Sequence, residues 1–247
     1  MAKVIPSTWE GIPQTIVDRF GEQAGRQRIM VHDGHFVLVV HLVPGADDLD
    51  RKAAIFWRNP SGTWKSTGAV KGGFSALREI VGAYKTRVTE LEAELEQSKR
   101  AAAYFKLLND IAPILRSARH LHKALQEARE AMPKEAPLIA LRDTAGEIER
   151  AAELIQSDAK AGLDFTTAKR AEEQAELSEH IARSSHKLNL IAALTLPMSA
   201  IGAVFGVNLQ HGLETRHSPW VFWVFVALSF VVGFLVKGWI SKDEKRA

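Results

Sequence analysis

Cysteine is absent from the 247 residues of the chain, and this absence excludes several kinds of chemistry. Without thiols the protein has no disulfide, no thiolate nucleophile and no cysteine-bound zinc or iron–sulfur centre. An excess of one charge is also missing: the net charge of +3 is too small to indicate binding to nucleic acid. The sequence shows no catalytic triad, nucleotide-binding glycine loop or paired catalytic carboxylates. We therefore expect neither an enzyme nor a resident cofactor.

Charged residues are nearly absent from residues 188–236, where only Glu214 and Arg216 carry charge. The mean hydropathy of −0.09 therefore averages a polar body and an apolar C-terminal region. Two apolar runs lie in that region, and a bilayer core of ~30 Å needs about 20 helical residues. We predict two transmembrane helices, over residues 188–207 and 220–240. The alternative is a buried helical hairpin of a soluble protein, which the missing polar face of both runs disfavours.

Lysine and arginine flank the two runs on one side only. The residues before the first run are Lys169, Arg170, Arg183 and Lys187, and those after the second are Lys237, Lys242, Lys245 and Arg246. The connector between the runs holds only Arg216. Because positive charge stays inside, we expect a multi-pass protein of the inner membrane with both termini cytoplasmic, ending in a basic tail over residues 241–247. The lipid bilayer is then an obligatory partner.

The pattern of the N-terminal part is typical of strands. Apolar segments at residues 28–32, 35–43 and 53–57 are separated by turn-forming residues, and a further strand could begin near Trp64. The Asp33-Gly34 pair between the first two segments is a strong hairpin signal. We predict a small cytoplasmic α/β module over residues 1–72, with three or four strands and a short helix within residues 11–20.

The period becomes helical from Gly73 onward and indicates a stalk over residues 73–187. The residues in helical register are Tyr84, Val88, Leu91 and Leu95, then Phe105, Leu108, Ala112 and Leu115, then Leu141, Ala145, Ile148, Ala152 and Ile155. The third set begins a helix that we expect to run unbroken from about residue 138 to 207, weakened by Gly162. So long a helix needs neighbours, which predicts an oligomer. The predicted fold class is an α+β membrane protein whose third stalk helix continues into the first of two C-terminal spans.

The end of the first span carries a motif. Pro197 lies mid-span, eight residues follow, and Gly206-Val207-Asn208 stands at the outer end before a short loop and the final span. The Gly-Val-Asn tripeptide alone is typical of an ordinary helix C-terminus. Its position after a long helix, with a basic tail behind the last span, resembles the CorA family of divalent-cation channels and transporters. The family's usual motif is Gly-Met-Asn, so Val207 is a departure.

The resemblance implies a homopentamer around one pore, with divalent cations as the transported partners. Five Asn208 side chains would form a ring at the outer mouth and accept hydrogen bonds from water around an entering ion. This suits Mg²⁺, which gives up its water reluctantly. Val207 leaves Zn²⁺, Co²⁺ and Ni²⁺ as alternative ions, and a membrane-anchored coiled-coil scaffold without transport is the alternative function.

One face of the first span has the character of a pore lining. The residues on it are Ser185, Leu188, Ala192, Leu196, Ser199 and Ala203. Small residues let helices crowd an axis, and rings of Leu188 and Leu196 could gate a pore by dewetting, with Pro197 as a kink. A packing face in a non-conducting bundle is the alternative.

Carboxylates also gather in the N-terminal module, at Asp47, Asp48 and Asp50. In the CorA family, cytoplasmic carboxylates between subunits bind Mg²⁺ and hold the channel closed. The resemblance therefore makes these residues a candidate regulatory Mg²⁺ site, with Glu147 or Glu149 as the partner acid on the long helix. The histidines, His120 and His122 among them, lack the spacing of a zinc site.

Overall fold

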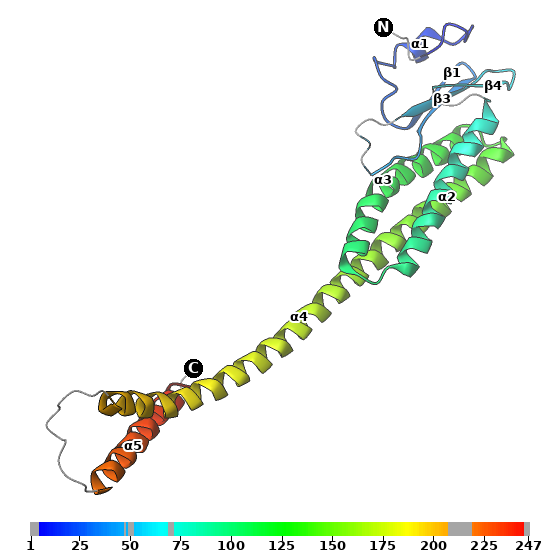
Figure 1. The fold of residues 1–247 in the computed structure, drawn as a ribbon. Coiled ribbons are helices and arrows are strands. Elements are labelled where there is room, and N and C mark those ends of the chain that lie inside the picture. The colour runs from blue at the N-terminus through cyan, green and yellow to red at the C-terminus, as the bar shows by residue number, and fades with distance from the viewer. Residues whose placement is uncertain (1–4, 47, 49–51, 69–71, 207–218, 245–247) are drawn as a thin grey trace. The chain divides into compact units, whose positions relative to one another are not determined.

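The computed structural model describes residues 5–46, 48, 52–68, 72–206 and 219–244 (Figure 1). The chain divides into two compact units, residues 1–169 and residues 170–247. Helix α4 (Ala136–Gly206) contributes to both, because the boundary falls within it. The boundaries predicted at residues 72 and 187 separate the N-terminal module, the stalk and the membrane region rather than compact units. They remain predictions.

A four-stranded antiparallel sheet forms the N-terminal part of the first unit. Its strands β1 (Arg28–His32), β2 (His35–His41), β3 (Ala53–Arg58) and β4 (Trp64–Gly68) follow one another in sequence order. This is the upper of the two strand numbers predicted. Asp33 and Gly34 join β1 to β2 with φ of 46° and 75°. Positive φ at both positions is the geometry of the predicted two-residue hairpin.

Each face of the sheet is covered by a different part of the chain. One face packs on the N-terminal segment with α1 (Gln14–Val17), through a cluster of Ile5, Trp9, Ile16, Met30, Val37, Val39, Ile55 and Trp57. The other face supplies Phe36, Leu38, Val40, Ala54 and Phe56 to a larger core shared with the helices. Successive strand residues point to opposite faces, and both faces are covered, so β2 and β3 are buried at nearly every position rather than at every second one.

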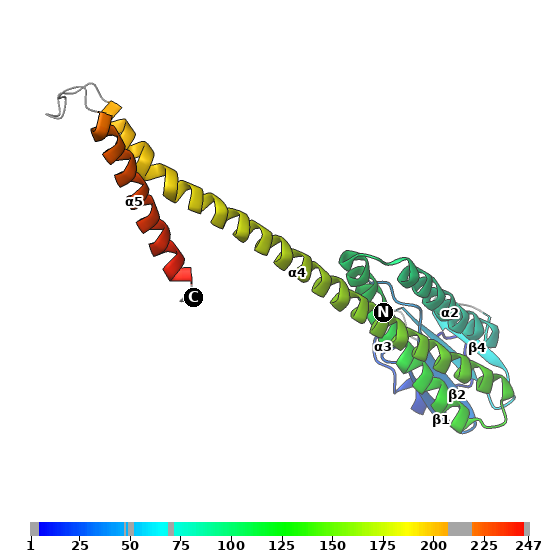
Figure 2. The same cartoon turned by 90° about the horizontal axis from the view of Figure 1, so that it is seen from below.

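Three helices share the core on the second side of the sheet (Figure 2). They are α2 (Phe74–Gln97), α3 (Ala101–Ala131), which contains Pro113, and the first part of α4. Two of them, α2 and α3, contact the strands of the sheet directly. The predicted α2 face is confirmed: Tyr84, Val88 and Leu91 are buried and Leu95 is partly buried. The predicted α3 face is wrong at Phe105, which is 59% exposed. It is confirmed at Leu115, which is buried, and at Leu108, which packs partly buried against the core. The other buried residues of this side include Leu107, Ile111, Ile114, Ala118 and Leu121.

Helix α4 confirms the expectation of one unbroken helix, since it runs for 71 residues with Pro197 inside it. Its predicted apolar register is also confirmed, because Leu141, Ala145, Ile148, Ala152 and Ile155 are all buried. No residue is buried between Lys160 and Ala192. The helix is therefore packed within the chain over its first third and exposed along the middle.

The second unit contains the rest of α4 and helix α5 (Pro219–Glu244). Among the residues of this unit whose burial the structure describes, Ser229 is a buried polar residue. Taking the described residues alone, none of the helices combines the length and the apolarity required to traverse a bilayer. The two spans predicted over 188–207 and 220–240 thus remain predictions.

Candidate functional site

The predicted pore-lining residues all lie on α4. Leu188 and Leu196 are 67% and 65% exposed in the single chain. Ser185, Ser199 and Ala203 are exposed as well, and Ala192 is half-buried. Because the helix is regular from Ala136 to Gly206, the three- and four-residue spacing of these positions places them on one face. That face is available for contacts outside the chain.

The selectivity motif is only partly within the described structure. Gly206 is the last residue of α4 that the structure describes. Val207 and Asn208 lie outside the described residues. Pro197 sits in the last third of the helix without ending it. The proposed roles of these residues therefore rest on the sequence.

Of the three N-terminal carboxylates, the structure describes only Asp48. Its Oδ2 accepts a hydrogen bond from the backbone N–H of Gly45 at 2.8 Å. Asp47 and Asp50 lie outside the described residues. In the described part of the chain, no three histidine or acidic side chains come together in a way that could hold a metal ion. One chain by itself thus does not build the predicted regulatory site from the described residues.

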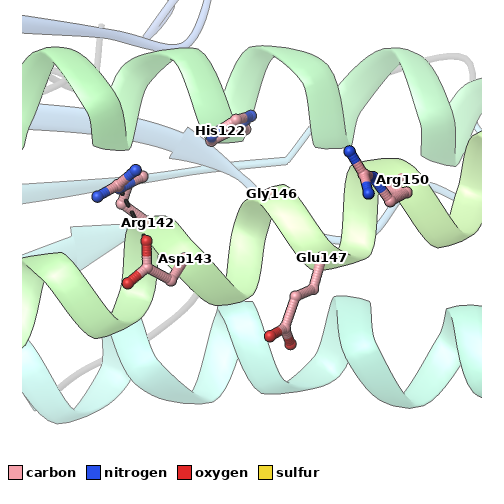
Figure 3. A pocket seen from close by; sticks show the side chains of 6 residues that line it. All are labelled: His122, Arg142, Asp143, Gly146, Glu147 and Arg150. Atoms are coloured by element: carbon pink, nitrogen blue, oxygen red, sulfur yellow. Dashed lines mark ion pairs between the residues drawn. The ribbon is translucent and has the colours of Figure 1, made fainter.

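Glu147, the partner acid predicted on the long helix, lines an open pocket of about 370 Å³ (Figure 3). The other lining residues are His122 from α3 and Arg142, Asp143, Gly146 and Arg150 from α4. Arg142 Nε lies 3.1 Å from Asp143 Oδ1, and Glu147 is exposed. Two guanidinium groups and two carboxylates line the pocket together, so it has no marked preference for charge of one sign.

Glu149, the other acid considered as a partner, is already occupied. Its Oε2 lies 2.7 Å from His122 Nδ1, and its Oε1 lies 3.8 Å from Arg119 Nε. Arg119 also donates to Glu153 Oε1 at 2.7 Å. These contacts join α3 to α4, so Glu149 serves the packing of the two helices. Of the two acids, Glu147 is the one left open to solvent.

Sequence reasoning did not find the role of His122. A glycine allows this contact: a Cβ on Gly146 would stand 3.3 Å from His122 Nε2, so the missing side chain leaves room for the imidazole. The sequence contains only a glycine on one predicted helix, Gly146, and a histidine on another, His122. Nothing in the spacing says that they face each other.

Comparison with known proteins identifies the family of this chain. A family model described as "CorA-like Mg2+ transporter protein" matches residues 69–242. Among solved structures, the full-length CmaX protein is similar with a TM-score of 0.58 at 14% identity, covering 92% of this chain and 81% of that one. The cytoplasmic domain of ZntB from Vibrio parahaemolyticus is similar with a TM-score of 0.54 at 12% identity, covering 66% of this chain and 80% of that one.

A search among curated proteins gave no match. The identities to CmaX and ZntB are low, so these two similarities concern the fold alone. The family match is of another kind, because it spans more than two thirds of the chain and includes the helices and the Gly206-Val207-Asn208 motif. The protein belongs to the family of CorA-like Mg²⁺ transporter proteins, which are transporters and not enzymes.

Proposed function

We propose that this chain forms a homopentameric channel for divalent cations, with Mg²⁺ as the principal ion. The observation that carries the proposal is the family match over residues 69–242, because this range contains both apolar runs and the Gly206-Val207-Asn208 motif. In the proposed arrangement residues 188–207 and 220–240 cross the inner membrane. Lysines and arginines flank them on the side of the two termini, which is therefore the cytoplasmic side.

The pore is lined by the exposed face of α4. Five copies of Ser199 and Ala203 leave room near the axis, since small side chains let helices approach closely. Leu188 and Leu196, both about two-thirds exposed in the single chain, form two apolar rings. Water leaves a narrow apolar constriction readily, so these rings close the pore when the helices move inward. Helix α4 is continuous with the helical core of the first unit, which gives that unit a means to act on the pore.

Asn208 selects the ion in this proposal. Its amide oxygen accepts hydrogen bonds from water molecules bound to the cation, so that the ion need not lose its hydration shell at the entrance. Mg²⁺ holds its water more firmly than Ca²⁺ does, and a site that reads the hydrated ion therefore suits it. The second candidate ion is Zn²⁺, and the observation in its favour is Val207, which replaces the methionine usual in the motif.

Ion flux into liposomes tests the function. The parent protein is expected to carry Mg²⁺ down an imposed membrane potential, measured with a Mg²⁺-sensitive dye, and Asn208→Ala is expected to reduce the flux at least about tenfold. That factor corresponds to the loss of one hydrogen-bonding ring toward a charged species. Asn109→Ala, the same change at an exposed position of α3, is the control and should transport normally.

The result for the parent decides between the functions. If the parent carries Zn²⁺ but not Mg²⁺, the principal ion is Zn²⁺ and the assignment of Mg²⁺ is wrong. No ion-dependent flux in the parent contradicts the channel and leaves the scaffold. A dimer by mass measurement contradicts it too, since two copies cannot surround a five-fold pore.

We further propose that Mg²⁺ regulates the channel by binding between subunits, at Asp47, Asp48 and Asp50 of one copy and Glu147 of the next. Support comes from the open position of Glu147 and from the engagement of Glu149 by His122 and Arg119. Two sets of acids on different copies repel each other, and a divalent cation between them removes that repulsion. Binding then stabilises one arrangement of the subunits.

Limited proteolysis checks this regulation. Added Mg²⁺ is expected to slow digestion of the parent, and Asp47→Ala/Asp48→Ala should abolish the protection because the site loses two carboxylates. Asp158→Ala changes an exposed acid elsewhere on α4 and should leave the protection intact. Protection that is the same in the parent and in the double variant rules out these residues as the site.

A further inference from the structure

Three arginines lie within the ten residues that lead from the end of α1 into β1. Arg28 opens β1, Arg26 stands two residues before it, and Arg19 follows α1. Arg28 Nη2 donates to the backbone carbonyl of Arg19 at 3.1 Å, which brings the two ends of this ten-residue segment together. The segment is part of the first unit and covers one face of the sheet (Figure 1).

The guanidinium of Arg28 is held in place by two neighbours. Its Cζ lies 5.3 Å from the centre of the Phe20 ring, in cation–π contact. Gly25 is a second close neighbour: a Cβ there would stand 2.9 Å from Arg28 Nη1, and Gly25 has a φ of +74° that favours glycine. The guanidinium is therefore oriented before any ligand arrives, which lowers the entropic cost of binding.

Nothing within the described chain neutralises this cluster. Across the described ranges, none of the three arginines makes an ion pair with a carboxylate. Of the acids nearest in sequence, Asp18 accepts a hydrogen bond from Gln14 at 2.6 Å, and Glu22 is exposed. Burial, with the positive charges of Arg26 and Arg19, lowers the pKa of the Arg28 guanidinium. The positive charges of Arg26 and Arg19 thus disfavour the charge on Arg28, and a bound anion would offset this effect.

We propose that Arg19, Arg26 and Arg28 form a binding site for a phosphate group. A guanidinium presents two parallel N–H donors that match two phosphate oxygens, and three positive charges favour a multiply charged anion over a carboxylate. The phosphate belongs either to a small soluble ligand or to the headgroup of an anionic lipid. The site uses none of the residues assigned to the ion pathway, and the proposal stands whether or not the chain conducts cations.

Calorimetric titration of inorganic pyrophosphate onto the full-length protein in phosphatidylcholine nanodiscs tests the site. The parent is expected to bind, more weakly as salt is added. Arg26→Ala should raise the Kd about tenfold, the loss expected for one charge-assisted hydrogen bond. Arg28→Lys keeps the charge but loses the planar fork, so it should also weaken binding. Arg78→Ala is the matched control, because the guanidinium of Arg78 also lies over an aromatic ring, 5.9 Å from the centre of Phe74.

A second arm identifies the source of the phosphate. The same nanodiscs are mixed with large vesicles that contain phosphatidic acid, and flotation is compared with that on phosphatidylcholine vesicles. Binding of pyrophosphate that Arg26→Ala weakens supports a soluble ligand, and flotation on phosphatidic acid alone that Arg26→Ala abolishes supports a lipid headgroup. Without ligand, the melting temperature of Arg26→Ala should not fall, because a repelling charge is removed. No binding of either probe, or equal binding by parent and Arg26→Ala, overturns the site.

Discussion

Replacing Gly73 by alanine should lower the free energy of unfolding by about 2–5 kcal/mol, the sum of backbone strain and overpacking. Gly73 precedes α2 with a φ of +60°, a conformation that a residue with a Cβ adopts at a cost. The added Cβ would also stand 2.7 Å from the backbone carbonyl oxygen of Trp64 in β4. A carbonyl held in a sheet cannot move aside as a side chain can, so strain and overlap add.

Gly82→Ala provides the matched control on the same helix. Gly82 lies inside α2, it is exposed, and a Cβ there would meet nothing within 4 Å. Alanine should therefore stabilise the protein by about 0.5–1 kcal/mol, through the higher helix propensity alone. Urea-induced unfolding of the full chain, followed by tryptophan fluorescence, measures both variants. Equal effects of the two substitutions would show that the Gly73 conformation and its contact with Trp64 carry no strain.

The second large effect is expected at Tyr84, which is fully buried where the sheet meets the helices. Its hydroxyl lies 2.6 Å from Ser117 Oγ on α3 and donates toward the carbonyl oxygens of His41 and Leu42, at 3.2 and 3.1 Å. Gln27 Nε2 joins the same group by donating to the Ser117 carbonyl at 2.9 Å. One hydroxyl thus links α2, α3 and the end of β2 away from water.

Tyr84→Phe should cost about 1–3 kcal/mol, because the ring stays and buried polar groups lose a partner. The only other tyrosine, Tyr104, donates to the Ser98 carbonyl at 2.8 Å from a half-buried position. Tyr104→Phe should cost about 0.5–1 kcal/mol or less, since water can replace the lost partner there. The comparison uses the same chemical change twice in urea unfolding. A cost at Tyr84 no greater than at Tyr104 would mean that the buried network does not stabilise the fold.

The role of Gly162 could not be predicted from its own segment of the sequence. In the sequence this residue looks like a weakness in a long helix, because glycine costs about 1 kcal/mol relative to alanine. In the structure a Cβ at this position would stand 2.5 Å from two ring atoms of Tyr104 on α3. The glycine therefore lets a tyrosine pack directly on the backbone of α4. Helix propensity is a property of the segment, whereas this contact depends on which helix lies alongside.

The sequence alone determined the order and kind of the elements. Short apolar segments with Asp33-Gly34 between them predict the hairpin, and the period of 3.5–3.6 predicts three stalk helices whose third runs unbroken to Gly206. These are local signals, written in residues close together along the chain. The resemblance to the CorA family likewise came from a motif of a dozen residues, and the family model that spans residues 69–242 confirms it.

Only the tertiary structure decided which side chains meet. The buried side of α3 is the one with Leu107 and Ile111 rather than Phe105, because the sheet and two helices select one apolar stripe out of two that overlap on the same helix. Glu149 pairs with His122 while Glu147 stays open, although the two acids are two residues apart. A helix turns by about 100° per residue, so neighbours in sequence face different surroundings. The sequence shows the spacing of Glu147 and Glu149, and the packing of α3 on α4 decides which of them meets His122.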